Sequence, residues 1–240
     1  MSLFKSSKTV DTTAGGTETG MVNLIKTARV SLEKGGLAGQ RAAVYLVLDR
    51  SGSMIPFYDD QSVQNLAEQA LGLSANLDDD GTVPVVFFDN VAYPAVEVSL
   101  TAYQGVIGRV NQQLGMMGGT AYAPAMQAVI NHYTASGCTD PAFVIFQTDG
   151  RPDSRSEAEQ AIRDASRLPL FWVFVGFGDE DSSEFDFLRK LDTMNGRVVD
   201  NAAFFGAGRD PQRMSDADLY AKLLAEFPQW LTASRAAGVR

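Results

Sequence analysis

Small oxygen-bearing side chains of the kind that bind hard cations occur in three separated segments of the 240-residue chain. Asp49, Ser51 and Ser53 alternate along the first segment, so a carboxylate and two hydroxyls can converge on one point. Thr120 offers a further hydroxyl from a glycine-rich stretch, and Asp149 offers a second carboxylate. Mg²⁺ prefers near-octahedral coordination by such oxygens and usually keeps a position for an outside ligand. These residues therefore predict a metal site that binds Mg²⁺, with Mn²⁺ and Ca²⁺ as alternative ions.

Each of these residues also has an ordinary structural explanation. Asp49 and Ser51 can cap a following helix, Thr120 can cap the next one, and Asp149 with the glycine after it forms a common turn. A single residue of this kind would favour the structural explanation. Their joint occurrence after predicted strands favours a metal site instead.

The segments that carry these residues lie between apolar runs and amphipathic stretches. Strands are predicted at residues 42–48, 83–88, 91–98, 142–146, 170–175 and 197–200. Helices are predicted at residues 61–76, 103–114, 124–133, 157–167, 183–194 and 215–227. Runs that are apolar on both faces and alternate with helices indicate a parallel sheet with helices on both faces. We therefore expect an α/β domain over residues 41–232, built on a doubly wound, mostly parallel six-stranded sheet.

Two further signals refine this sheet and its ligand site. The pair Asp89-Asn90 predicts a two-residue hairpin, and Pro94 in the following run makes that run an antiparallel edge strand. Pro228 is expected to end or kink the last helix. In doubly wound sheets the ligand binds outside the carboxyl ends of the strands, which is where Asp49 and Asp149 are placed.

The sequence outside this domain predicts less structure. Residues 1–20 are rich in Thr, Gly and Ser and contain no apolar run long enough for a signal peptide or a membrane span. We expect them to form a flexible arm on a cytoplasmic protein. Residues 21–40 predict a lead-in helix from Met21 to Lys34 and a linker, and residues 233–240 predict a tail.

Composition narrows the classes of function. The chain has 29 acidic and 20 basic side chains, a net charge of −9, which argues against nucleic acid and anionic membranes as partners. Cys138 is the single cysteine, so the chain cannot form an internal disulfide. His132 is the single histidine, which excludes a zinc site built from several histidines.

The segments 49–54, 118–120 and 148–150, which read DRSGSM, GGT and TDG, resemble the metal-ion-dependent adhesion site of von Willebrand factor A (vWA) domains. The chain is most similar to the intracellular bacterial branch that accompanies tellurium-resistance and stress-response proteins. The resemblance implies a vWA, Rossmann-like fold. It also implies direct coordination by Ser51, Ser53 and, depending on the state of the site, Thr120, with Asp49 and Asp149 binding directly or through water. A partner's Asp or Glu would complete the coordination, and the Thr120 loop would move when that partner binds.

Taken together, these observations predict a divalent-metal-dependent protein-interaction module of the tellurium-resistance or stress response, without enzymatic activity. The alternative is a metal-dependent phosphatase-like or nucleotide-processing enzyme. Ser51 stands where a haloacid-dehalogenase-type phosphatase needs a second aspartate, and neither a phosphate-binding G-x-x-x-x-G-K-[ST] loop nor a G-x-S-x-G elbow is present. The sequence leaves the partner and the oligomeric state open. It also leaves two interpretations of Arg50, which either guides the incoming acid or points into solvent.

Overall fold

The computed structural model describes residues 13–239, apart from the side chains of residues 13–18 and of Asp192. Its strands form one sheet in the order β3-β2-β1-β4-β5-β6. They are β1 (Ala43–Asp49), β2 (Thr82–Phe88), β3 (Val96–Ser99), β4 (Ala142–Thr148), β5 (Leu170–Phe177) and β6 (Ala202–Gly208). Only the β2–β3 pairing is antiparallel, and the other four pairings are parallel. The predicted doubly wound sheet with one antiparallel edge strand is confirmed.

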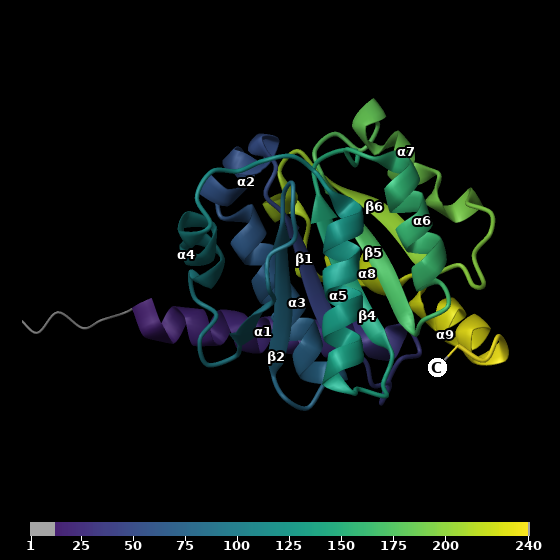
Figure 1. Cartoon of the computed structure of the whole chain (residues 1–240). Helices are drawn as coiled ribbons and strands as arrows, with labels where there is room; N and C mark the ends of the chain where they lie inside the picture. The colour runs from purple at the N-terminus through teal and green to yellow at the C-terminus, as the bar shows by residue number, and fades with distance from the viewer. Residues whose placement is uncertain (1–12, 240) are drawn as a thin grey trace, which may run out of the picture.

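Helices cover both faces of this sheet (Figure 1). One face is covered by α1 (Thr13–Lys34), α2 (Ile55–Asp59), α3 (Ser62–Leu77), α4 (Val106–Gln113), α8 (Asp216–Leu224) and α9 (Phe227–Ala236). The other is covered by α5 (Tyr122–Ser136), α6 (Arg155–Ala165) and α7 (Asp186–Arg189). Short 3₁₀ turns lie at Gly52–Met54, Ser183–Phe185, Leu191–Thr193 and Pro211–Arg213. Among the described residues, no helix is both long and apolar enough to cross a membrane.

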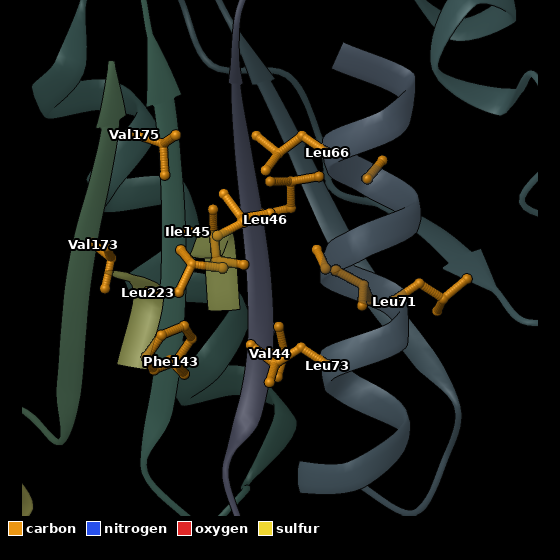
Figure 2. Close-up of a cluster of buried hydrophobic side chains, with 14 of the residues drawn as sticks. Val44, Leu46, Leu66, Leu71, Leu73, Phe143, Ile145, Val173, Val175 and Leu223 are labelled. Atoms are coloured by element: carbon orange, nitrogen blue, oxygen red, sulfur yellow. The ribbon is translucent and has the colours of Figure 1, made fainter. Parts of the chain in front are cut away.

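The core on the α3 side shows why the central strands are rich in apolar residues. Every residue of β4 and β5 is buried, because helices pack on both faces of these strands. Figure 2 shows Val44 and Leu46 of β1 beside Leu73 and Leu66 of α3. This packing fixes the positions at which β1 and β4 end, and so fixes the loops that follow them.

Several predicted boundaries differ from the structure. Helix α1 begins at Thr13, so the predicted start at Met21 is wrong and part of the predicted arm is helical, while residues 1–12 lie outside the described residues. The chain reverses at Asp89-Asn90 as predicted, since Phe88 and Ala92 form an antiparallel bridge, but the regular pairing of β3 with β2 begins only at Val96. The helix predicted over 183–194 is a series of short turns around α7.

The last strand and the last helix also lie elsewhere. The strand predicted at 197–200 is irregular, and the sheet is completed by β6 instead. Gly206 of β6 packs so closely that a Cβ there would lie 2.4 Å from Glu180 Cβ, so a side chain cannot replace it without a shift. Helix α9 occupies part of the predicted tail, and its Phe227 and Trp230 rings pack on Phe171 of β5.

Two helical glycines provide a test of how α1 packs on the domain. A Cβ at Gly72 of α3 would lie 2.8 Å from Leu24 Cβ of α1, whereas a Cβ at Gly108 of α4 meets nothing within 4 Å. Alanine in place of a helical glycine adds up to about 1 kcal/mol of stability, but overpacking costs about 1–3 kcal/mol. We expect Gly108→Ala to raise the free energy of unfolding and Gly72→Ala to lower it, as measured by thermal denaturation. Equal stabilisation by both substitutions would contradict the close α1–α3 contact.

Candidate metal centre

The predicted site residues meet where β1 and β4 end side by side. Asp49 is the last residue of β1, and Asp149 follows the last residue of β4, which is the parallel neighbour of β1. The Ser51 hydroxyl donates to Asp149 Oδ1 at 3.3 Å and lies 3.2 Å from Ser53 Oγ. Ser53, Thr120 and Asp149 all line one open cleft of about 460 Å³. The structure therefore brings the five sequence-predicted residues to one edge of the sheet.

Asp49 lies at the bottom of this site and is fully buried. Its Oδ1 accepts a hydrogen bond from the Ser51 amide and its Oδ2 accepts one from Thr148 Oγ1, both at 2.6 Å. Burial raises the pKa of Asp49 to about 7, although these hydrogen bonds act in the opposite direction. Nearby Asp149 raises the pKa further. Asp49 is thus a carboxylate whose charge the protein itself compensates poorly.

Asp149 has similar surroundings nearer to solvent. Burial raises its pKa, while hydrogen bonds from the Ser53 and Ser51 hydroxyls lower it and the Glu184 carboxylate raises it. Among the described residues, neither Asp49 nor Asp149 forms an ion pair with a basic side chain. Two carboxylates and three hydroxyls at one edge of the sheet, without an ion-paired basic side chain among the described residues, form a donor set that fits a hard divalent cation.

Hydroxyls and carboxylates both contribute oxygens to this candidate site. Across residues 13–239, apart from the side chains left undescribed, no three His, Cys, Asp or Glu side chains gather in a way that would hold a metal ion. His132 is not part of the site, because its Nδ1 lies 3.1 Å from the hydroxyl of Tyr45 and its Nε2 lies 3.6 Å from Glu97 on the edge strand β3.

The loop that carries Thr120 is held against the β1 loop by backbone hydrogen bonds. The Gly118 amide donates to the Arg50 carbonyl and the Gly52 amide donates to the Gly118 carbonyl, both at 3.0 Å. The Thr120 amide donates to Asp153 Oδ2 at 2.7 Å. A Cβ at Gly118 would lie 2.5 Å from Asn90 Nδ2, so this glycine is needed for close approach.

Sequence reasoning missed two residues that hold this loop. Asn90 Oδ1 accepts a hydrogen bond from the Gly119 amide at 3.0 Å, and Asp153 accepts the bond from Thr120. Asn90 was interpretable from sequence only as a turn residue, and Asp153 only as an acidic residue before a helix. No local pattern in the sequence identifies their partners.

The structure corrects both interpretations of Arg50. Its side chain is fully buried, so it neither points into solvent nor reaches the cleft where an incoming acid would enter. Its Nη1 donates to Asp89 Oδ2 at 2.8 Å. The guanidinium is therefore committed to an internal ion pair next to the site.

Metal binding at this site should depend on pH. The metal-free Asp49 has a pKa raised to about 7, and a metal ligand must be deprotonated. We expect Mg²⁺ affinity to be nearly constant above pH 8 and to weaken by about tenfold per pH unit below 7, because one proton then competes with the metal. Calorimetric titrations of Mg²⁺ between pH 6 and 8 measure this, and an unchanged dissociation constant at pH 6 would contradict a role for Asp49.

Comparisons with known proteins identify the family and the fold. A family model described as "vWA found in TerF C terminus" (vWA-TerF-like) matches residues 41–240. The uncharacterized protein YcbR of Bacillus subtilis (strain 168) is 38% identical over 218 residues, which cover 89% of this chain and 87% of YcbR. The uncharacterized protein sll0103 of Synechocystis sp. is 29% identical over 137 residues, which cover 56% of this chain and 31% of that protein.

Solved structures show the same fold at low sequence identity. A von Willebrand factor type A protein from Catenulispora acidiphila has a TM-score of 0.55 and 19% identity, covering 78% of this chain and 42% of that chain. The manganese-loaded TRAP protein of Plasmodium vivax has a TM-score of 0.52 and 17% identity, covering 78% of this chain and 74% of that chain. The sheet order, the site at the ends of β1 and β4, and the family match over residues 41–240 lead to one conclusion: this chain belongs to the TerF-like family of von Willebrand factor A domains.

Proposed function

We propose that this protein is a divalent-metal-dependent protein-interaction module. The observation that carries the proposal is the pair of carboxylates, Asp49 and Asp149, which lie together without a basic partner among the described residues and within a network of hydroxyls. The proposed ligands of the cation, by preference Mg²⁺, are Asp49, Ser51, Ser53, Thr120 and Asp149. When bound, the cation supplies a positive charge and an open coordination position.

The residues differ in what they contribute. Asp49 is fully buried and fixed by two short hydrogen bonds, so it can orient the Ser51 segment through the hydrogen bond that it accepts from the Ser51 amide. Ser53, Thr120 and Asp149 line the open cleft and can contact both a cation and an outside ligand. The outside ligand that we propose is an Asp or Glu side chain of a partner protein, because a carboxylate is the protein group that binds such a cation most strongly.

An interaction module fits the site better than an enzyme does. The single histidine contacts Tyr45 and Glu97 rather than the cleft, so the site has no imidazole to act as a base. The manganese-loaded state of the Plasmodium protein with the same fold supports metal binding as a property of such folds. We further propose a cytoplasmic location and a role in the tellurium-resistance or stress response, and the name of the matched family supports that role. The net charge of −9 supports a protein partner over nucleic acid or membranes.

A metal-dependent binding experiment tests this proposal. Immobilised protein is expected to retain a partner in the presence of Mg²⁺ and to release it when EDTA is added. An Asp149→Ala column should retain none of that partner, and changing one acidic residue of the partner to its amide should abolish binding. Retention that is equal with Mg²⁺ and with EDTA would contradict the proposal.

A further inference from the structure

Arg50 lies between the proposed metal ligands Asp49 and Ser51 in the sequence, yet its side chain does not line the cleft. The guanidinium is fully buried and uses all three nitrogens as hydrogen-bond donors. Its Nη1 donates to Asp89 Oδ2, its Nε donates to Asn111 Oδ1, and its Nη2 donates to the Gly115 carbonyl, each at 2.8 Å. These contacts join the loop after β2, the last turn of α4 and the start of the Thr120 loop.

The contact with Gly115 is the one that bears on the metal centre. Gly115 has a positive φ of 77° and begins the loop that continues to Thr120. Farther along this loop, Asp89 accepts the Ala121 amide at 2.8 Å through its backbone carbonyl, and Asp153 accepts the Thr120 amide. Arg50 therefore holds the near end of the loop, while Asp89 and Asp153 hold the far end.

A buried ion pair adds little to the stability of a fold, because the free-energy cost of removing two charges from water can equal the gain from pairing them. An apolar side chain in place of Arg50 would fill the same space, but it would offer no donor to the Gly115 carbonyl. Tyr93 completes the arrangement, since its hydroxyl donates to Asp89 Oδ2 at 2.8 Å and its ring lies under the guanidinium. The network thus orients Arg50 toward Gly115.

We infer that Arg50 is a positioning residue, which holds the Thr120 loop at the distance from Ser51 and Ser53 that metal binding requires. This inference rests on the proposed function, because the loop carries the proposed ligand Thr120. Groups that orient metal ligands without touching the metal typically contribute 10–100-fold to metal affinity. Arg50 acts on Thr120 in this way through the backbone of the loop.

The test compares Arg50→Met with wild type by two measurements. We expect Arg50→Met to weaken Mg²⁺ binding by about tenfold or more in calorimetric titrations. In metal-free protein, we expect faster amide hydrogen exchange across residues 115–121 and unchanged exchange in α3. Arg163→Met is the matched control, because Arg163 pairs with Glu159 on α6 outside the site, and it should change neither measurement.

A second variant separates positioning from stability. In Arg50→Met, Asp89 is a buried charge without its partner, which destabilises the fold. The double variant Arg50→Met/Asp89→Asn removes that charge and should recover stability, while Mg²⁺ affinity stays weak and the loop still exchanges fast. If the double variant recovers wild-type affinity, the positioning role is overturned. If wild type does not bind Mg²⁺ at all, the proposed function fails. Unchanged hydrogen exchange of the loop in metal-free Arg50→Met would overturn the role of Arg50, whether or not wild type binds Mg²⁺.

Discussion

Asp149→Ala is expected to weaken Mg²⁺ binding by more than about 100-fold, which titration calorimetry at pH 8 measures directly. Groups that only orient metal ligands contribute about 10–100-fold, so the loss of a proposed direct ligand should exceed that range. Asp149 is also the proposed carboxylate that lines the open cleft, where cation and partner would meet. Without it, the site keeps a single buried carboxylate and its hydroxyls.

The control for this prediction is Asp186→Ala, which makes the same change of charge at an exposed position. Asp186 pairs with Arg189 at 2.7 Å on α7 and has no contact with the proposed ligands. We expect it to leave Mg²⁺ affinity unchanged, and circular dichroism of both variants verifies that they are folded. If Asp149→Ala and Asp186→Ala bind Mg²⁺ equally well, the five-residue metal site is wrong.

Four of the five proposed ligands were predictable from the sequence because they lie within a few residues of the end of β1 or β4, whereas Thr120 lies in the glycine-rich loop before α5. Fully apolar strands are recognisable by composition, and parallel strands place their carboxyl ends at one edge of the sheet. Asp49 and Asp149 come together because β1 and β4 are neighbouring parallel strands, an order that the structure shows and that was not predicted from the sequence. The geometry that joins them, through Ser51, follows from that topology.

The hydrogen-bond network around Arg50 could not be predicted from the sequence, because it depends on contacts between residues far apart in the chain. Arg50 bonds Asn111 and Gly115, and these lie 61 and 65 positions away. An arginine at an apparent loop position is exposed in most proteins, which is why burial of this one was missed. Its partner Asp89 was interpretable only as a turn residue.

Two elements were missed for local reasons. The run that forms β6 contains Gly206, Gly208 and several alanines around two phenylalanines and has no β-branched residue, so it lacks the pattern of a typical strand. Pro228 was interpreted as the end of a helix, but it stands in the first turn of α9, where a proline is well tolerated because its missing amide would have no partner.

Asp49→Asn is expected to stabilise the metal-free protein while it weakens metal binding. The unfolded carboxyl ionises near its ordinary pKa of 3.8, whereas burial raises the pKa of folded Asp49 to about 7. Stability of the metal-free wild type therefore falls as pH rises through this interval, by on the order of 4 kcal/mol at pH 8. Asparagine has no charge to desolvate, and it can still accept the Ser51 amide and contact Thr148.

Thermal denaturation in EDTA at two pH values measures this effect. At pH 8 we expect Asp49→Asn to melt several degrees higher than wild type, since each kcal/mol raises the melting temperature by about 2–4 °C in a chain of this length. At pH 4 the difference should nearly vanish, because Asp49 is then protonated in the folded protein. Saturating Mg²⁺ should reverse the order at pH 8, since wild type gains more stability from binding than the variant, whose affinity is weaker. A variant that is less stable than wild type in EDTA at pH 8 would mean that the Asp49 charge is compensated within the protein. The case for a cation at this site would then lose its main electrostatic support.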